Sequence, residues 1–373
     1  MKYSILSLLL FSMAIVSCQR VKKEEKTNTQ SDAYTGETKE SVISYPEENH
    51  LKNIRQLTWG GDNAEAYWSF DDSMLVFQAT NEEWGIECDQ IYYTKRTTNN
   101  MGKVPPKMIS TGKGRTTCAY FMPGDTSILY ASTHLGGDDC PSVPDKREDG
   151  KYVWPIYESF DIFLADLDGN IIQQLTDYPG YDAEATVSPR GDKIVFTSMR
   201  SGDLELYTMN LDGSEVKQIT FDLGYDGGAF FSHDGTRLVF RSSRPKTESE
   251  IKEYKDLLAQ GLVTPTQMEI YTCNVDGSNL KKITDLGGAN WCPYFHPSDQ
   301  KIVFSSNHAT ERGFPFNLFM INIDGTDLEQ ITHDGVFDAF PMFSRDGKRL
   351  VFSSNRNNKG TDDTNLFIAE WTD

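Results

Sequence analysis

Gln174-Leu175-Thr176 begins a pattern that continues through the turn Val187-Ser188-Pro189-Arg190-Gly191 to the apolar strand Ile194-Val195-Phe196. The three-residue motif recurs at Gln56-Leu57-Thr58, Gln218-Ile219-Thr220, Lys282-Ile283-Thr284 and Gln330-Ile331-Thr332, with a degraded copy at Met108-Ile109-Ser110. Each copy leads to an apolar strand that ends on an aromatic residue, namely Phe77, Tyr130, Phe196, Phe240, Phe304 or Phe352. From the centre of the motif to this aromatic residue the interval is 21 positions in five copies and 20 in the first. This common spacing indicates a chain built from six structural repeats.

Each repeat reads as four short strands joined by tight turns. Asp-Gly pairs supply the turn chemistry at Asp212-Gly213, Asp276-Gly277 and Asp324-Gly325. Tandem four-stranded units of about 40 to 50 residues are typical of propeller blades. The last repeat is not followed by another motif, so we expect the segment 54–58 to supply its outer strand. The sequence therefore predicts an all-β fold, a six-bladed β-propeller over residues 51–373.

These repeats resemble those of the TolB-like propellers, the family of the periplasmic Tol–Pal translocation protein. The resemblance rests on the Gln-Leu-Thr motif, the Ser-Pro-Asp-Gly-like turn, the apolar strand and the Asp-Gly turn, and it covers all six repeats. Related blades occur in the non-catalytic propeller of prolyl-oligopeptidase-type enzymes, but no region of hydrolase size is left outside these repeats. The resemblance implies a propeller fold and a role in envelope integrity or transport. It does not specify the function, because functional sites are grafted onto folds.

The N-terminal residues carry the features of a bacterial lipoprotein signal. Lys2 precedes an apolar run over residues 5–16, which is shorter than the roughly 20 residues that a membrane-spanning helix needs. The run ends in Ile15-Val16-Ser17-Cys18, where a small residue lets the signal peptidase approach and the Cys18 thiol accepts the lipid. A plain secretory signal with a chance cysteine is the alternative. We predict a signal peptide over residues 1–17, lipidation of Cys18 and a flexible tether over residues 18–50, because this polar stretch buries too little apolar surface to fold.

Composition and motif content narrow the range of partners. The formal net charge of −19 argues against nucleic acid as a partner, since phosphate binding needs basic patches. We expect no cofactor and no metal, because the chain has no nucleotide-binding fingerprint and no cysteine–histidine cluster with zinc-ligand spacing. Cys88 and Cys140 fall in equivalent loops of adjacent repeats and are the best candidates for a disulfide. Cys273 reads as an apolar core residue, whereas Cys118 and Cys292 occupy one position in opposite repeats and are expected to stay unpaired.

Two positions can be compared in every repeat, one seven residues after the motif centre and one four residues after the closing aromatic residue. In repeats three, four and six they carry an aspartate and an arginine, which predicts structural ion pairs. These pairs are Asp182–Arg200, Asp226–Arg244 and Asp338–Arg356. Repeats two and five instead carry Thr116 with His134 and Asn290 with His308. A histidine without a carboxylate partner can bind a ligand, so these four residues are candidate ligand-binding residues, with a neutral substitute for the ion pair as the alternative.

Two repeats are lengthened directly after the histidine or arginine position, in repeats two and four. Long loops on a rigid scaffold are where binding residues concentrate. The first insertion contains Trp154 and Tyr157, whose rings suit stacking on a peptide or a sugar, or simple packing onto the rim. In the second insertion, a capping box at Thr247 and a stop at Gly261 predict a helix.

Glu65 and Glu184 fall at equivalent inner-strand positions of repeats one and three and are expected to line the channel. Two such carboxylates can support glycosidic chemistry, or can merely hold water or a cation. We expect a monomeric, lipid-anchored envelope protein, at the outer membrane on its periplasmic or surface face. We expect it to bind a protein, peptide or glycan partner without catalysis. The alternative is a hydrolase or lyase that acts on an extracellular polymer or peptide at the propeller mouth.

Overall fold

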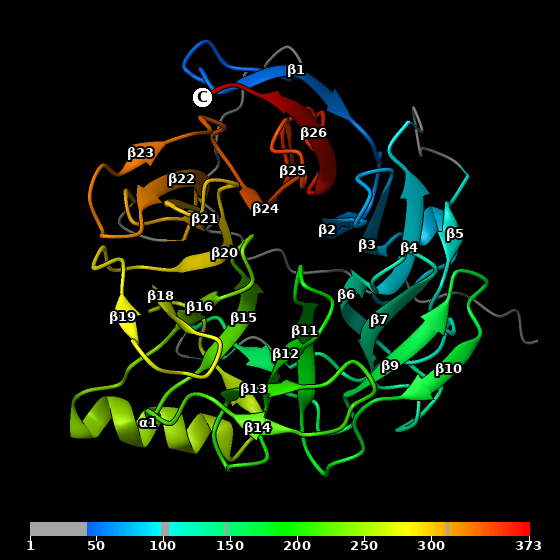
Figure 1. Cartoon of the computed structure of the whole chain (residues 1–373), viewed down its shortest axis with the longest axis vertical. Helices are drawn as coiled ribbons and strands as arrows, with labels where there is room; N and C mark the ends of the chain where they lie inside the picture. The colour runs from blue at the N-terminus through cyan, green and yellow to red at the C-terminus, as the bar shows by residue number, and fades with distance from the viewer. Residues whose placement is uncertain (1–42, 98–103, 145–146, 149, 311–312) are drawn as a thin grey trace, which may run out of the picture. The chain divides into compact units, whose positions relative to one another are not determined.

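Six four-stranded antiparallel sheets stand around a central axis in the computed structural model (Figure 1). The structure describes residues 43–97, 104–144, 147–148, 150–310 and 313–373. All six sheets belong to one unit, residues 40–373. The predicted six-bladed β-propeller is therefore confirmed. The predicted signal peptide, Cys18 and the tether up to residue 42 lie outside the described residues.

Each blade consists of an inner strand, two middle strands and an outer strand. Blade one comprises β2 Asp62–Trp68, β3 Met74–Thr80, β4 Gln90–Lys95 and β5 Lys107–Met108; blade two comprises β6 Thr116–Phe121, β7 Ser127–Ser132, β9 Asp161–Asp166 and β10 Ile171–Gln174. Blade three comprises β11 Asp182–Val187, β12 Ile194–Ser198, β13 Glu205–Met209 and β14 Lys217–Gln218; blade four comprises β15 Asp226–Phe231, β16 Arg237–Ser242, β18 Glu269–Asn274 and β19 Lys281–Lys282. Blade five comprises β20 Asn290–Phe295, β21 Lys301–Ser306, β22 Asn317–Asn322 and β23 Glu329–Gln330; blade six comprises β24 Asp338–Phe343, β25 Arg349–Ser354, β26 Asn365–Trp371 and β1 Leu51–Gln56.

The Gln-Leu-Thr motif joins the outer strand of one blade to the inner strand of the next. In all six copies the Thr or Ser hydroxyl accepts a hydrogen bond of 2.8 to 2.9 Å from a backbone N–H of the third strand. In blade three, Leu206 donates its N–H to Thr220 Oγ1 and accepts from the N–H of Ile219. The hydroxyl thus takes the place of a strand carbonyl where the chain leaves the sheet. This keeps a buried backbone donor satisfied, which is the physical reason for the repeated motif.

Blade six combines both ends of the described chain. Strand β1 pairs antiparallel with β26, from Leu51 opposite Trp371 to Gln56 opposite Phe367, and Figure 1 shows the two strands side by side. The strand begins three residues before the predicted segment 54–58. Because the last blade takes its outer strand from the beginning of the chain, its sheet has no unpaired outer edge at β26.

Residues 43–50 correct the predicted tether boundary, since they pack against blade six instead of forming a free linker. Glu48 is buried and accepts from the guanidinium of Arg356 at 2.9 and 3.1 Å. Tyr45 donates its hydroxyl to Asp334 at 2.8 Å. Arg356 is itself fully buried and also contacts Asp338, so its charge requires carboxylate partners on both sides.

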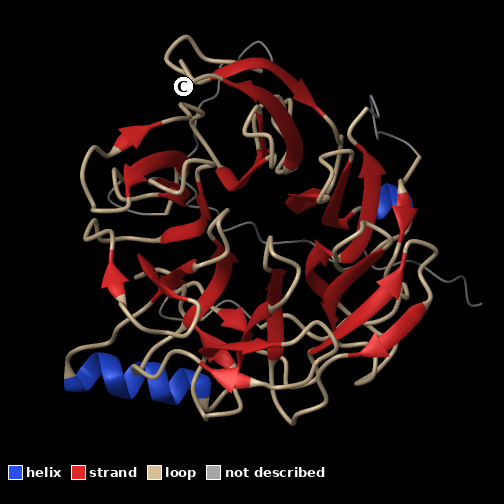
Figure 2. Cartoon of the chain, in the orientation of Figure 1, coloured by secondary structure: helices blue, strands red, loops and turns tan. Residues whose placement is uncertain are grey.

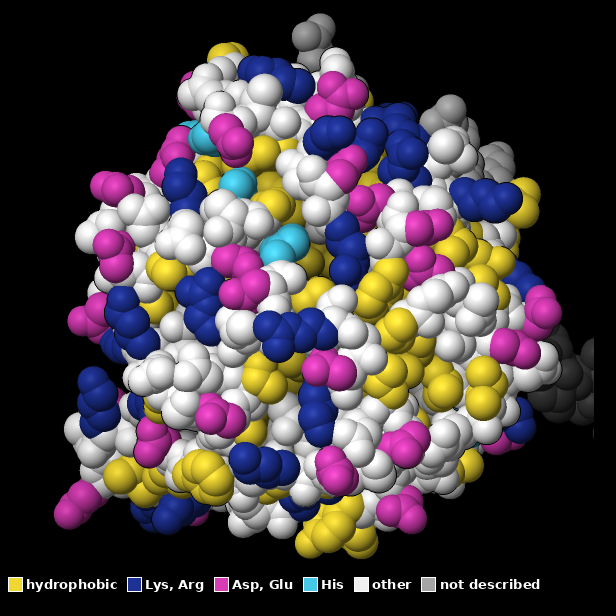
Figure 3. All heavy atoms as spheres, viewed as in Figure 1, with side chains coloured by type: hydrophobic (Ala, Val, Ile, Leu, Met, Phe, Trp, Pro, Cys, Tyr) yellow, Lys and Arg dark blue, Asp and Glu magenta, His cyan; other side chains and the backbone are white. Residues whose placement is uncertain are grey.

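The described residues contain one α-helix, α1 Glu248–Leu258, and one 3-10 turn, η1 Glu82–Trp84. Figure 2 shows α1 at the periphery of the ring of strands. No helix in the described part of the chain is long and apolar enough to cross a membrane. On the face shown in Figure 3, acidic and basic side chains are mixed rather than separated into large regions of one sign.

We predict that Glu48→Gln lowers the free energy of unfolding by about 1 to 3 kcal/mol, because it leaves the buried Arg356 charge with one carboxylate fewer. Urea unfolding of the purified protein measures the change. Glu47→Gln is the matched control, since Glu47 is exposed and adjacent in sequence. Equal stability of the two variants would show that residues 43–50 do not hold blade six in solution.

Candidate functional site

Each inner strand contains a β-bulge at the same position, and the bulged residue adopts a left-handed backbone with φ between 50° and 59°. The six bulged residues are Glu65, Cys118, Glu184, Gly228, Cys292 and Phe340. A bulge re-aims one side chain out of the regular alternation of the strand, here into the central channel. Positive φ costs a non-glycine residue on the order of 1 to 2 kcal/mol. Strain of this kind concentrates at functional sites, so the bulges mark the channel as the candidate site.

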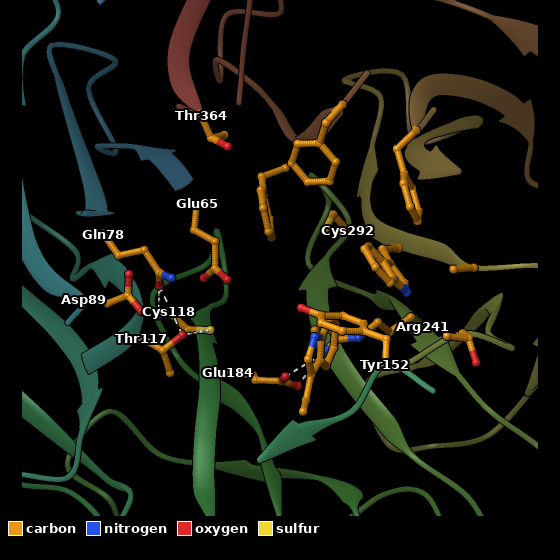
Figure 4. A pocket seen from close by; sticks show the side chains of 18 of the residues that line it. Glu65, Gln78, Asp89, Thr117, Cys118, Tyr152, Glu184, Arg241, Cys292 and Thr364 are labelled. Carbon is orange, nitrogen blue, oxygen red and sulfur yellow. Dashed lines mark hydrogen bonds and ion pairs between the residues drawn. The ribbon is translucent and has the colours of Figure 1, made fainter. Parts of the chain in front are cut away.

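The channel forms a cavity of about 1200 Å³ that is lined by residues of all six blades (Figure 4). Its floor is made by side chains two positions beyond the bulges. Tyr67 of blade one meets Phe230 of blade four with ring centroids 5.3 Å apart, and Phe230 meets Tyr294 at the same distance. Because rings from opposite blades touch across the axis, they close the channel and leave the cavity open towards one face.

The two insertions meet above the cavity. Strand β8 Trp154–Pro155 of blade two pairs with strand β17 Leu262–Val263 of blade four. The Trp154 ring lies 5.3 Å from the ring of Trp291 and 5.4 Å from the Arg241 guanidinium. The paired insertions therefore extend the cavity with an aromatic wall.

Helix α1 supports this wall from behind. Its predicted capping box at Thr247 is confirmed, and its buried face consists of Tyr254 and Leu257. Tyr254 joins one apolar cluster with Ile156 and Val263 of the insertions, and Leu258 packs against this cluster. The helix thus buttresses the mouth of the cavity.

Apolar side chains also form the outer rim of the cavity. Four of its lining residues are 46 to 67% exposed, namely Val143, Tyr152, Phe314 and Val336. Exposed apolar residues that border a concave site are typical of surfaces that bind a partner.

A buried cluster of Glu184, Arg241 and Tyr225 forms one side of the cavity. Glu184 accepts hydrogen bonds from Arg241 and Tyr225 at 2.5 Å each, and from Thr197 and the N–H of Gly228 at 2.8 Å. Burial raises the pKa of Glu184, but the Arg241 guanidinium and these hydrogen bonds outweigh it, and the net shift is downward. Glu184 is therefore a fixed carboxylate that neutralises Arg241.

Two glycines make room for this cluster. A Cβ atom on Gly228 would lie 1.9 Å from Arg241 Nη1, and one on Gly227 would lie 2.3 Å from Glu184 Oε2. Blade four thus has no side chain at its bulge, and Arg241 of the second strand reaches the channel through the space that remains.

Glu65, at the bulge of blade one, has a different environment. Burial raises its pKa from 4.5 to about 7, and the charge of Glu184 adds to the rise, while a hydrogen bond from the Cys118 thiol opposes it. The Oε2 atom of Glu65 is buried and has no hydrogen-bond partner among the described residues. Figure 4 shows the carboxyl group at the cavity, across from Glu184. The pKa values of the two equivalent glutamates are thus shifted in opposite directions.

The channel thiols are poorly suited to nucleophilic chemistry. Burial raises the pKa of Cys118 well above its ordinary value, and that of Cys292 to about 12. A thiol reacts as its thiolate, which these environments disfavour. Among the described residues, no group of three or more His, Cys, Asp or Glu side chains is arranged to hold a metal ion.

Of the eight candidate ligand residues, the structure brings five to the cavity: Glu65, Glu184, Thr116, Trp154 and Tyr157. His134, His308 and Asn290 do not line it. Each histidine bonds through Nδ1 to a serine of its own blade at 2.9 Å and packs on a phenylalanine ring, at 4.4 Å for His134 and 4.5 Å for His308. Burial lowers the pKa of both. They occupy the place of Arg200 in blade three, which lies over the equivalent ring of Tyr207, and these contacts favour the alternative of a neutral packing substitute.

The three predicted ion pairs lie within their blades. The shortest distances are 2.6 Å for Asp182–Arg200 and Asp226–Arg244, and 3.2 Å for Asp338–Arg356. Cys88 and Cys140 form the predicted disulfide, which ties the insertion of blade two to blade one. Cys118, Cys273 and Cys292 are free.

Sequence reasoning missed Arg241, Tyr225 and Trp291. A signal for Arg241 was present, since the residue after the closing aromatic is small in four of the other blades and Gln78 in blade one. Blade four therefore departs from the repeat at two positions, with an arginine after the closing aromatic residue and a glycine pair at the bulge. Tyr225 and Trp291 stand at less regular positions and gave no comparable signal.

Comparisons with known proteins agree with this architecture. Residues 157–264 match the family model of the TolB β-propeller domain. A candidate TolB from Agrobacterium tumefaciens has a similar structure, with a TM-score of 0.52, 19% identity and coverage of 84% of this chain and 91% of its own. TolB from Acinetobacter baumannii gives a TM-score of 0.49 at 18% identity over 83% of this chain and 63% of its own, and an oligogalacturonate lyase in complex with manganese gives 0.46 at 12% over 86% and 91%. No curated protein matches the chain in sequence.

We predict that Glu65→Gln stabilises the protein at pH 8 and has little effect at pH 4. The folded wild type holds the Glu65 proton between pH 4.5 and about 7, whereas the unfolded chain releases it. As the pH rises through this window, the free energy of unfolding of the wild type therefore falls by roughly 3 kcal/mol in total for this group. Above the window it is level. The variant lacks this loss.

Urea unfolding at both pH values measures the difference. Glu184→Gln is the matched control at the equivalent bulge and is expected to destabilise the protein at pH 8, because it leaves Arg241 unpaired. A Glu65→Gln variant that is less stable than the wild type at pH 8 would contradict the unfavourable burial of the Glu65 carboxylate.

Proposed function

We propose that this TolB-like six-bladed propeller is a lipid-anchored envelope protein that binds an extended peptide segment of a partner protein in its central cavity. The observation that carries the proposal is a large aromatic cavity, closed at its floor and bordered by an exposed apolar rim. A cavity that is closed at one end accepts a chain end or a protruding loop. Pockets of this kind bury most of their ligand and are pre-formed.

The lining favours a peptide over a glycan. A sugar brings many hydroxyl groups, each of which loses water on binding and needs a polar partner in the site. Here Arg241 and Glu184 are bonded to each other, Arg115 to Asp89, and Gln78 to Thr117. These polar groups are engaged within the protein, whereas the aromatic walls suit the apolar side chains of a peptide.

Placement in the cell envelope is part of the same proposal. The lipoprotein signal that ends at Cys18, together with the disulfide between Cys88 and Cys140, supports an oxidising compartment outside the cytoplasm. The resemblance to TolB supports the same location. A lipid anchor on the chain would hold the cavity near a membrane surface without inserting the propeller.

Acid–base chemistry on a polymer or peptide is the second candidate. The observation in its favour is the pair of channel glutamates, since the pKa of Glu65 is raised to about 7 while that of Glu184 is lowered. Against it, Glu184 already accepts four hydrogen bonds and neutralises Arg241, which leaves it poorly available as a base or nucleophile. Turnover of a polysaccharide or peptide that is lost in Glu65→Gln would favour this candidate over binding alone.

We predict that a photo-crosslinking residue at Val143, on the rim, captures a discrete partner in the native cells. Phe221 is the matched control position, because it is 72% exposed, against 67% for Val143, and does not line the cavity. Trp154→Ala in the Val143 background should reduce capture on the order of tenfold or more, as truncation of a central aromatic residue in a buried interface commonly does. Mass spectrometry of the product identifies the partner segment.

The expected product is a peptide crosslinked at Val143 and absent at Phe221. Equal products at both positions would indicate non-specific contact. No product at Val143 while the protein is folded and abundant would contradict the binding role.

We further predict that Cys18→Ser abolishes lipid attachment and releases the protein from the membrane fraction. Metabolic labelling with a fatty-acid analogue, followed by fractionation, measures both effects. Ser17→Ala keeps a small residue before the cysteine and serves as the control, with labelling retained. A Cys18→Ser protein that still carries the label would exclude the predicted anchor.

A further inference from the structure

The charges that line the cavity are not balanced. Among the described lining residues, the carboxylates are Glu65, Asp89, Glu184 and Asp362, and the basic side chains are Arg115 and Arg241. Arg241 is paired with Glu184, and Arg115 with Asp89 at 2.5 Å. Both arginines are therefore paired within the protein, and the described part of the cavity wall holds no further cation to pair with Glu65 or Asp362.

Glu65 is the less exposed of these two. Its Oε2 atom is inaccessible to solvent and lacks a hydrogen-bond partner among the described residues. Leaving a buried polar atom without a partner normally costs free energy on the order of one lost hydrogen bond. Each such atom therefore needs a structural or functional explanation. The left-handed backbone at Glu65, with φ of 54°, fixes the direction of this side chain into the channel. The protein holds the carboxyl group in place and leaves this one oxygen without a hydrogen bond.

The surroundings of Glu65 suit a cation. Tyr67, Phe340 and Trp291 line the same cavity, and aromatic faces attract ammonium and guanidinium groups when water is excluded. An anion would be repelled by the carboxylate of Glu65, and a purely apolar group would leave its charge uncompensated. A donor with positive charge supplies both a hydrogen bond and a compensating charge.

We propose that the cavity receives a positively charged group of the bound peptide, a Lys or Arg side chain or an N-terminal ammonium, against the carboxylate of Glu65. This inference rests on the proposed function, because it names the chemistry that the peptide must carry. The blind floor formed by Tyr67 and Phe230 places the cation at the end of the inserted segment.

The groups that face Glu65 make it the titrating member of the site. They are Tyr67 from its own strand, Cys118 from β6, Glu184 from β11 and Arg241 from β16, with the charge of Asp89 from the loop before β4. The pKa values of Tyr67, Cys118 and Arg241 are raised well above their ordinary ranges, and that of Glu184 is lowered. Below pH 7, a cation must therefore displace the Glu65 proton. Its affinity should fall by up to about tenfold per pH unit there and be level above pH 8.

Two synthetic random-sequence octapeptide libraries test the proposal, one with free amino termini and one N-acetylated. Each is passed over immobilised wild type, Glu65→Gln and Asp362→Asn at pH 8. We expect the wild type to enrich peptides with Lys or Arg, or peptides from the free-amine library alone, and Glu65→Gln to lose this preference. Asp362→Asn is the matched control, because it removes the same charge from an exposed position of the cavity. It should retain the preference.

The outcomes separate the inference from the proposed function. Enrichment of uncharged peptides by the wild type would keep the peptide-binding role and overturn the cation. An unchanged preference in Glu65→Gln would also overturn it, since the carboxylate would then be unnecessary. No enrichment by the wild type from either library would overturn both.

Calorimetry on one enriched peptide supplies a second measurement. Glu65→Gln is expected to weaken binding by at least about tenfold at pH 8, as removal of one partner from a buried charge pair does. The fall in affinity below pH 7 should disappear in this variant. A wild-type affinity that is independent of pH between 5 and 8 would contradict contact between the cation and Glu65.

Discussion

In a regular strand the side chains alternate between the two faces of its sheet, and in a propeller both faces pack against neighbouring blades. Such a strand has no side chain left for the central channel. The bulge in each inner strand removes this constraint for one residue, because a left-handed backbone turns its side chain towards the axis. Six equivalent bulges therefore produce a ring of six independent positions. The pocket chemistry depends on them, while the apolar packing between blades is undisturbed.

Blade four shows how far this arrangement can be altered. Its bulge carries Gly228, which alone among the six bulged residues adopts the left-handed conformation without a Cβ penalty. The vacant space admits Arg241 from the second strand, and Arg241 in turn holds Glu184 of blade three. One glutamate of the ring is thereby fixed as an ion, while Glu65, which lacks such a partner, is left near its neutral form. The opposite pKa shifts of these two equivalent glutamates therefore depend on Arg241, a residue of a third blade.

The repeat spacing was sufficient to predict the fold, the three ion pairs and the helix in blade four, because each follows from a local pattern or from equivalent positions. It also placed Glu65 and Glu184 in the channel. It also pointed to His134 and His308, which do not line the cavity, since a histidine without a carboxylate partner looks like a ligand in sequence. The Ser306 hydroxyl and the Phe319 ring that hold His308 become visible only in three dimensions. The role of residues 43–50 was missed for a related reason: Glu48 gains its partner Arg356 from the far end of the chain.

The pocket combines two unfavourable features, left-handed backbone at non-glycine residues and a buried carboxyl oxygen without a hydrogen-bond partner among the described residues. Neither contributes to the stability of the fold, and a small hydrophobic or glycine residue at position 65 would remove part of both costs. The ring around them is strongly determined by the Thr and Ser hydroxyls that close every blade and by β1, which joins the two ends of the chain. A scaffold fixed in this way can retain local strain that a less constrained sheet would relax. The placement of Glu65 lowers the stability of the fold, and binding of a ligand can compensate for this cost. The placement is therefore better explained by a ligand than by the architecture.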